Sequence, residues 1–214
     1  MLFDVNGTLT DTSAIGELWG RPELGDRVLA HAVSTAMVDA LLGVGGRSFR
    51  DHLRAALDVV IGEAGLDPEG VERALAVAAS LPARSGAGEA LAMLRDAGIR
   101  LIALTNSGAI GGQRTLEQCG LAGFFDLVLG VDAVNTFKPH PDVYAYARSR
   151  LGEQRAPVAM VATHPWDLAG AAHCGVRTAW VRHGARVWPA VFPRPDVQAD
   201  SLWDLARELL AHSW

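Results

Sequence analysis

The sequence is poor in cysteine, in net charge and in long apolar runs, and each shortage excludes a class of protein. Its two cysteines, Cys119 and Cys174, cannot build a disulfide framework and are typical of a reducing compartment, so we expect a cytoplasmic protein. The net charge of −5 offers no basic stripe, so nucleic acid is not an expected partner. No stretch predicts a signal peptide or a membrane span, and we expect no contact with a membrane.

The sequence nevertheless holds enough apolar residues for a sizeable core. Hydrophobic residues make up 50% of its 214 positions. No internal repeat or low-complexity tract interrupts them. We therefore expect one large domain, or a domain that carries an insertion.

A short apolar segment near the start of the sequence contains a carboxylate, Asp4, and is followed by a turn. Residues 2–5 lack polar alternation apart from this carboxylate, which predicts a strand buried on both faces, as in parallel sheets. Ligands of open α/β sheets bind beyond the carboxyl ends of the strands, so Asp4 is a candidate site residue. The same residues also fit a β-hairpin with an Asn6-Gly7 turn. A calcium loop fits less well, because the glycine comes too early in the loop.

The next 70 or so residues have helical spacing and no convincing strand. Apolar positions recur at helical intervals over about 26–42, 48–61 and 68–80, which predicts three helices. We interpret residues 13–84 as a helical cap domain inserted after the first strand.

The remaining residues alternate between helix and strand. Strands are predicted at 99–104, 127–129, 158–162 and 178–181, and helices at about 86–98, 109–119, 141–151, 166–174 and 201–211. Residues 185–196 contain three prolines and are predicted to form a loop. This alternation predicts an α/β fold, in which a Rossmann-like parallel sheet core has helices on both faces. Residues 1–12 and 85–214 would form this core domain, and Gly86 and Gly88 suit a hinge to the cap.

Polar residues follow several of the predicted strands. The carboxyl ends of parallel strands meet at one edge of a sheet, so we expect these side chains to lie close together. A carboxylate nucleophile needs a cation that keeps it ionised and hydrogen-bond donors that hold the substrate. The candidates are Asp4, Thr105, Asn106, Lys138, Thr163, His164 and Asp167.

Four short motifs in this order resemble those of the haloacid dehalogenase superfamily. They are residues 4–9, 104–107, 138–139 and 161–167. Within the superfamily, the Trp-Asp-Leu-Ala-Gly-Ala run at 166–171 and the Lys-Pro-His-Pro-Asp-Val-Tyr run at 138–144 are most similar to type II 2-haloacid dehalogenases. The resemblance spans nearly the whole chain and makes the hairpin interpretation less favourable.

The resemblance implies a hydrolase that works without a metal. An aspartate, Asp4 here, would displace a halide from carbon to form an ester, which water would then cleave. Lys138 would steady Asp4, and Asp167 would orient the lysine or the hydrolytic water. The small-molecule substrate would be held by Asn6, Thr105, Asn106 and His164. For His164, a hydrogen-bonded structural role and a proton-transfer role both remain open.

A phosphatase of the same superfamily is the alternative function. Such enzymes usually carry an acid two residues after the nucleophile, where this chain has Asn6, and a magnesium ligand early in the fourth motif, where it has Thr163. We therefore expect no cofactor, or at most weak Mg²⁺ binding at Asp4 and Asp167. A catalytically impaired protein that binds a ligand is a third interpretation.

One position of the cap departs from the dehalogenase pattern. The resemblance implies an arginine that contacts the leaving halide, and a rough alignment places Asp39 there. A carboxylate would repel a halide and a carboxylate substrate. Arg47, Arg50 and Arg54 from the next helix are the candidate replacements. The apolar faces of the cap also suit a homodimer.

Overall fold

Six parallel strands form the centre of the molecule. The computed structural model describes residues 1–151, 158–184 and 186–211. Its strands are β1 (Leu2–Phe3), β2 (Ile102–Thr105), β3 (Leu127–Gly130), β4 (Ala159–Ala162), β5 (Arg177–Val181) and β6 (Val197–Ala199). They lie in the order β3-β2-β1-β4-β5-β6, with β1 between β2 and β4. The hairpin interpretation of the first residues is therefore wrong, since β1 pairs in parallel with strands about 100 and 160 residues away.

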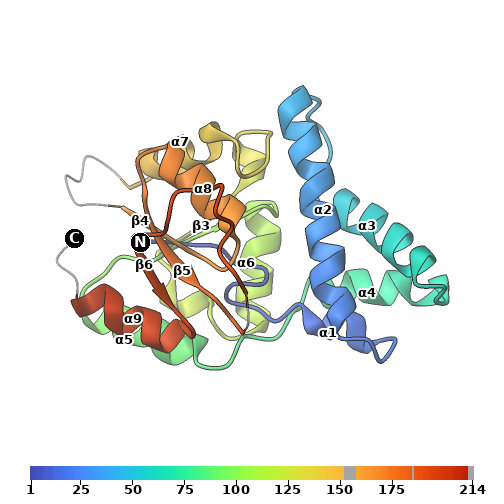
Figure 1. Ribbon diagram of the computed structural model, residues 1–214, viewed down its shortest axis with the longest axis horizontal. Helices are drawn as coiled ribbons and strands as arrows, with labels where there is room; N and C mark the ends of the chain where they lie inside the picture. Colours follow the sequence, from blue (N-terminus) through green and yellow to red (C-terminus); the bar gives the residue numbers. More distant parts are fainter. Residues whose placement is uncertain (152–157, 185, 212–214) are drawn as a thin grey trace.

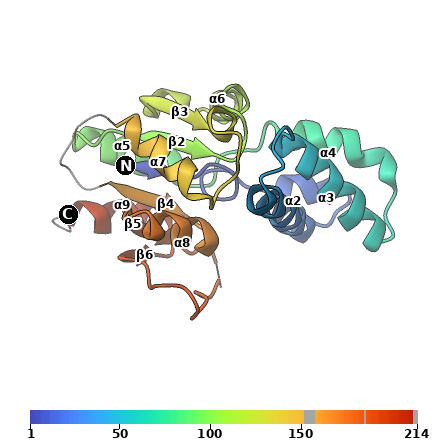
Figure 2. The same ribbon diagram turned by 90° about the horizontal axis from the view of Figure 1, so that it is seen from above.

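Helices cover both faces of the sheet (Figures 1 and 2). The helices of this part are α5 (Ala87–Asp96), α6 (Ala109–Gln118), α7 (Pro141–Ser149), α8 (Pro165–His173) and α9 (Leu202–Ala211). The side chains of β1 alternate, so that Leu2 belongs to the core under α7 and α8, and Phe3 to the core under α5 and α9. Short 3₁₀ turns lie at η2 (Ala122–Phe124) and η3 (Val131–Ala133). The predicted Rossmann-like α/β fold is confirmed.

A group of helices stands beside the sheet, on the right in Figure 1. It comprises α1 (Ser13–Glu17), α2 (Glu23–Leu42), α3 (Phe49–Glu63), η1 (Pro68–Gly70) and α4 (Val71–Ala78). Helix α2 is the one nearest the sheet in Figures 1 and 2. A capping box between Ser48 and Asp51 fixes the start of α3, and Gly43, with φ 62°, ends α2. The assignment of residues 13–84 to a separate cap domain stays a prediction.

One α-helix and one strand were not predicted from the sequence, and several element boundaries differ from the predicted ones. Helix α1 has only five residues and β6 only three, so neither is long enough to show a periodic pattern. The strand predicted over 99–104 begins at Ile102, where its amide bonds to the carbonyl of Met1 next to β1. Helix α7 ends at Ser149, two residues before its predicted end. The predicted loop at 185–196 carries no helix or strand over 186–196, and residue 185 lies outside the described residues.

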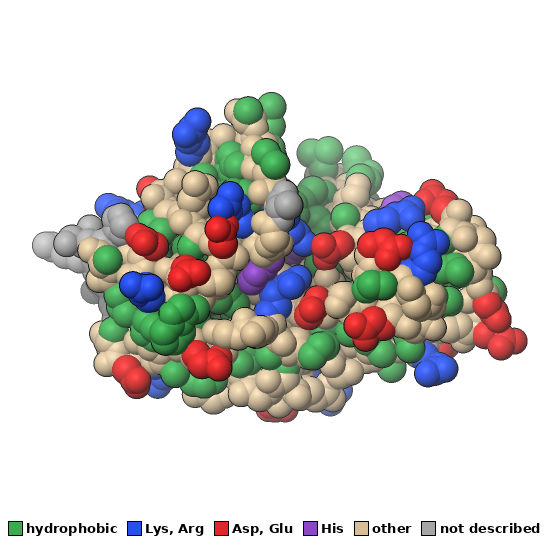
Figure 3. All heavy atoms as spheres, turned by 60° about the horizontal axis from the view of Figure 1, so that its bottom comes forward, with side chains coloured by type: hydrophobic (Ala, Val, Ile, Leu, Met, Phe, Trp, Pro, Cys, Tyr) green, Lys and Arg blue, Asp and Glu red, His purple; other side chains and the backbone are tan. Residues whose placement is uncertain are grey.

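Within the described ranges, none of the helices is both long and apolar enough to cross a bilayer. On the face shown in Figure 3, acidic and basic side chains are interspersed over the core and over the helical group.

Candidate active site

A buried lysine lies between two carboxylates at the carboxyl end of β1. The Nζ of Lys138 is 2.7 Å from Oδ1 of Asp4 and 2.7 Å from Oδ2 of Asp167. Its third contact is the carbonyl oxygen of Leu104, at 2.9 Å. An ammonium has three hydrogens, so all its donors are used. The structure thus brings together the three side chains for which the sequence predicted catalytic roles.

The turn after β1 holds the second oxygen of Asp4. Gly7, with φ 83°, lets the chain reverse, and the Thr8 hydroxyl then donates a 2.6 Å hydrogen bond to Oδ2 of Asp4. The Thr8 oxygen in turn accepts a hydrogen bond of 3.0 Å from the amide of Thr163 after β4. Thr8 was not predicted as a site residue. Its position four residues after Asp4, within the first motif, was the feature of the sequence that could have indicated a role in the site.

Helix α7 supplies a second residue that sequence reasoning missed. The Tyr144 hydroxyl lies 2.7 Å from Oδ1 of Asp167 and 3.0 Å from its backbone oxygen. Gly170 allows this approach of α7 and α8, because a Cβ there would lie 2.7 Å from the Tyr144 hydroxyl oxygen. Tyr144 therefore orients Asp167 toward Lys138. Tyr144 is the last residue of the Lys-Pro-His-Pro-Asp-Val-Tyr run, but the sequence pattern did not indicate its hydrogen-bond partner.

The charged groups of this cluster shift the pKa values of one another. Burial opposes the ionised form of Asp4, but the Lys138 ammonium, with His164 and Thr8, outweighs burial and lowers the pKa of the carboxyl. Burial likewise opposes the charge on Lys138, yet the two carboxylates raise the pKa of its ammonium. For Asp167, burial and the charge of Asp4 raise the pKa against the pull of Lys138. Asp4 is thus kept ionised as a nucleophile needs to be.

A small pocket opens beside Asp4 between the sheet and the helical group. The space among its lining atoms, counted together with the open solvent at its mouth, is about 240 Å³. The helical group contributes apolar side chains, and the strand ends contribute polar ones. The lining residues are Asp4, Asn6, Leu29, Val33, Phe49, Thr105, Asn106, His164 and Trp166. All four residues predicted to bind substrate therefore line the pocket.

Asn106 presents a free donor at this pocket. Its Oδ1 accepts a 2.8 Å hydrogen bond from the backbone amide of Lys138. Its buried Nδ2 has no partner among the described residues. A buried amide hydrogen without a partner is costly, so this group is suited to an oxygen of a bound ligand. Thr105 is engaged differently, because its hydroxyl oxygen accepts a 3.1 Å hydrogen bond from the amide of Ser107.

His164 faces the same pocket from the loop after β4. Its Nε2 lies 2.9 Å from the carbonyl oxygen of Asn6 and 3.6 Å from Oδ2 of Asp4. The ring stacks on Trp166, with 5.3 Å between centroids and 19° between planes. A Cβ on Gly7 would lie 3.0 Å from Nε2, so the loops leave the ring little space to move. His164 thus has a fixed position next to the candidate nucleophile.

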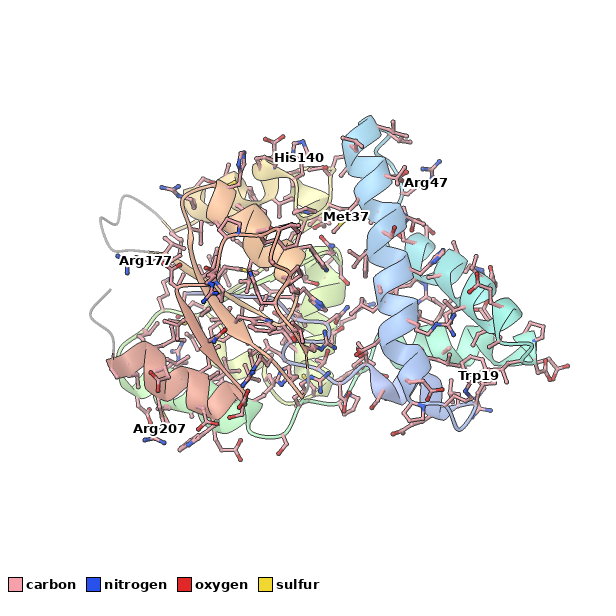
Figure 4. All side chains as sticks on the ribbon, in the orientation of Figure 1. Trp19, Met37, Arg47, His140, Arg177 and Arg207 are labelled. Carbon is pink, nitrogen blue, oxygen red and sulfur yellow. The ribbon has the colours of Figure 1, made fainter. Side chains whose placement is uncertain are left out.

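None of the three arginines proposed to contact the leaving halide, Arg47, Arg50 and Arg54, lines this pocket. Arg47 lies 2.6 Å from Oδ1 of Asp39, and Arg54 pairs with Glu72. In Figure 4, Arg47, from the loop between α2 and α3, lies on the side of α2 that is away from the sheet. Neither Asp39 nor Arg50 is among the lining residues. The carboxylate at Asp39 is therefore balanced by Arg47 outside the pocket.

The acidic residues do not fit a magnesium ion. Mg²⁺ needs oxygen atoms that are free to coordinate it. Both oxygens of Asp4 contact Lys138 or Thr8, and both oxygens of Asp167 contact Lys138 or Tyr144. The described part of the chain contains no group of three or more His, Cys, Asp or Glu side chains placed to hold a metal. We therefore derive no step through a metal.

Comparison with known proteins places these residues in a family context. A family model described as haloacid dehalogenase-like hydrolase matches residues 1–175. The (S)-2-haloacid dehalogenase of Xanthobacter autotrophicus is 31% identical over 191 residues, which cover 85% of this chain and 74% of that protein. The (S)-2-haloacid dehalogenase 2 of Pseudomonas sp. (strain CBS-3) is 32% identical over 107 residues, 50% of this chain and 47% of that protein. The match thus spans about half the length of that curated relative.

A solved structure supports the same relationship over the whole fold. The structure of L-2-haloacid dehalogenase from Xanthobacter autotrophicus with chloropropionic acid covalently bound aligns with a TM-score of 0.87 at 25% identity. The alignment covers 99% of this chain and 98% of that one. With the family model and the buried Asp4-Lys138-Asp167 cluster, this agreement shows that the chain belongs to the haloacid dehalogenase-like hydrolases.

Proposed function

We propose that this protein hydrolyses a carbon–halogen bond of a small 2-halo acid through an ester on Asp4. The observation that carries the proposal is the 2.7 Å contact between Nζ of Lys138 and Oδ1 of Asp4 beside a small pocket. An ionised carboxylate held in one place can attack a carbon that bears a leaving group. In the Xanthobacter autotrophicus relative, chloropropionic acid is covalently bound, which supports the same kind of intermediate here.

The pocket suits the geometry of such an attack. Thr8 and Lys138 hold one oxygen each of Asp4, so the carboxylate cannot rotate away from the substrate. Fixing two reactants in an attack geometry contributes several kcal/mol, on the order of 7–11 in the best intramolecular cases. The free Nδ2 of Asn106 would donate to a carboxylate oxygen of the substrate. Substitution at carbon would then release the halide and leave the ester on Asp4.

The leaving group would lie among apolar side chains of the helical group. Leu29, Val33 and Phe49 line the pocket from that side. Of the described residues that line it, none is a lysine or an arginine. A halide would therefore be held by contact with apolar surface and by neutral donors rather than by a cation. We propose that this favours bromide and chloride over fluoride, because fluoride depends most on strong hydrogen bonds.

We propose that turnover needs no magnesium. The oxygens of Asp4 and Asp167 already have hydrogen-bond partners, and Lys138 supplies the positive charge between them. A magnesium ion would compete with this ammonium for the same oxygens. The phosphatase alternative requires magnesium to take these oxygens from the ammonium. It therefore predicts magnesium dependence and turnover of a phosphate ester.

A substrate panel tests the proposal. The purified chain and its Asp4→Asn variant are incubated in EDTA with short 2-chloro, 2-bromo and 2-fluoro acids, and halide release is followed. We expect halide from the wild type and none above background from Asp4→Asn. Absence of halide from every acid, together with magnesium-dependent release of phosphate from a phosphate ester, would contradict the proposal.

The oligomeric state also remains a proposal. Four apolar side chains at the end of α2 and just after it are exposed: Val38, Leu41, Leu42 and Val44. An exposed apolar patch of this kind is a common feature of protein interfaces. The homodimer expected from the sequence predicts twice the monomer mass in light scattering, whereas the monomer mass would contradict it.

A further inference from the structure

The second half of the proposed reaction requires a proton acceptor, and this inference rests on the proposed function. Once the halide has left, Asp4 is an ester and no longer carries a charge. Water must attack the carboxyl carbon of that ester, and a base must take a proton from the water. The base must lie within reach of the pocket.

The two other members of the buried cluster are poorly placed for this task. Lys138 is fully buried and uses all three hydrogens on Asp4, Asp167 and Leu104, and its raised pKa keeps it protonated. Asp167 is also fully buried, its oxygens contact Lys138 and Tyr144, and it does not line the pocket. Neither residue presents a free lone pair to water in the pocket.

Of the described residues that line the pocket, two carry titratable side chains, Asp4 and His164. Asp4 is consumed in the ester, which leaves His164. Its Nε2 is 3.6 Å from Oδ2 of Asp4, so the ring lies beside the carboxyl group that water must attack in the ester. An imidazole is the side chain best suited to accept a proton near neutral pH.

The hydrogen bonds around the ring assign its two nitrogens. A carbonyl oxygen only accepts, so the 2.9 Å contact with the carbonyl of Asn6 places a hydrogen on Nε2. In the neutral ring, Nδ1 then carries the lone pair. The polar contacts of the ring with described residues are made through Nε2, and none is made through Nδ1. The backbone of Asn6 thus selects the tautomer in which Nδ1 is free to act as a base.

We propose that His164 is the general base of ester hydrolysis. A water oxygen attacks Cγ of the Asp4 ester, and one water proton passes to Nδ1 of His164. The bond between Cγ and the substrate oxygen then breaks, and the imidazolium returns the proton to this oxygen. The products are the 2-hydroxy acid and the Asp4 carboxylic acid, which ionises beside Lys138 and releases one proton to solvent.

Step-resolved kinetics of a His164→Gln variant test this assignment. Glutamine keeps a donor for the Asn6 carbonyl but offers no base. Enzyme is mixed with excess 2-halo acid, and halide and intact protein mass are measured from milliseconds to minutes. We expect one halide per enzyme in a burst within about threefold of the wild-type rate. Later turnover should be slower by about 100-fold, with the ester mass accumulating on the protein.

Other results of this experiment would overturn the assignment of His164. Steady turnover within threefold of wild type, or loss of the burst together with turnover, would overturn the role of His164 as base. No halide from the wild type would overturn the proposed function and this inference with it. His173→Gln, at the exposed end of α8, is the matched control and should leave both steps unchanged. If His164→Gln does not fold, as judged by circular dichroism, His164→Asn replaces it with the same expected split between the steps.

Discussion

The ammonium of Lys138 lies 2.7 Å from the carboxylate of Asp4, although 134 positions separate the two in the chain. Lys138 is also the one lysine of the 214-residue sequence, and its side chain is fully buried. A buried charge of this kind is tolerated only when it is paired and hydrogen-bonded. The contact therefore links the stability of the fold to the proposed chemistry of its site.

Replacement of Lys138 by methionine should damage both stability and activity. Two buried carboxylates, Asp4 and Asp167, would lose their shared cation, and the free energy of unfolding should fall by about 3–5 kcal/mol. Urea unfolding measures this loss, and halide release should disappear. The double variant Lys138→Met/Asp167→Asn should recover part of the stability but no activity. If Lys138→Met alone were as stable as the wild type, the ion pairs of Lys138 with Asp4 and Asp167 would contribute little to stability.

Replacement of Tyr144 by phenylalanine should lower both the stability of the protein and its turnover number, but abolish neither. The change removes the 2.7 Å hydrogen bond to Oδ1 of Asp167 in a buried position. The loss should cost about 1–3 kcal/mol of unfolding free energy and lower the turnover number by roughly tenfold. Tyr146→Phe, on the same helix, serves as the control. Unchanged turnover in Tyr144→Phe would argue that Asp167 needs no orienting partner.

Acid should destabilise the fold through His183. Its Nε2 lies 2.9 Å from the carbonyl oxygen of Thr8, and burial lowers the pKa of the ring from 6.5 to about 4. Between pH 6.5 and 4 the unfolded chain binds a proton that the folded one does not, so stability falls as pH drops through this window. We expect a loss of about 1–2 kcal/mol, because solvent reaches part of the ring.

A variant that lacks only this histidine isolates the effect. Asparagine tolerates the φ of 43° at this position and does not titrate, so His183→Asn should lack this part of the acid loss. Urea unfolding at pH 4, 5, 6 and 7 compares the two proteins. If the free energy of unfolding of the two proteins fell equally between pH 7 and pH 4, His183 would not be the cause of the acid loss. The pKa of Asp4 is lowered, so its own contribution is lost only below the ordinary aspartate range of about 3.9.

Replacement of Arg47 by alanine should affect stability and spare activity. Arg47 pairs with Asp39 outside the pocket, and half of its side chain is exposed. The free energy of unfolding should fall by about 1 kcal/mol, while halide turnover should stay within twofold of wild type. A drop of more than tenfold in turnover would mean that Arg47 reaches the leaving group during catalysis.

Much of the site was predictable because parallel strands deliver their carboxyl ends to one edge of a sheet. Asp4, Thr105 and His164 each follow or end a strand, and the motif order placed Lys138 and Asp167 with them. The three longer helical segments of the group beside the sheet were predictable from their apolar spacing. These features depend on local patterns and on one topological rule.

The remaining features depend on distances that no local pattern encodes. Tyr144 reaches Asp167 only because α7 and α8 pack closely at Gly170. The partner of Asp39 depends on the loop between α2 and α3, which turns Arg47 back toward α2. The role proposed for His164 depends on which of its ring nitrogens contacts a carbonyl oxygen. Such contacts follow from packing, and periodicity in the sequence does not report them.

The fate of oxygen during turnover distinguishes attack by Asp4 from direct attack by water. In H₂¹⁸O, water that attacks Cγ of an Asp4 ester leaves ¹⁸O in the Asp4 carboxylate, while the product of the first turnover carries an oxygen from Asp4. After many turnovers, mass spectrometry of the peptide with Asp4 should show ¹⁸O, and a single turnover should give an unlabelled 2-hydroxy acid. Label in the product from the first turnover, with none in the peptide, would mean that water attacks the substrate directly and that Asp4 is not the nucleophile.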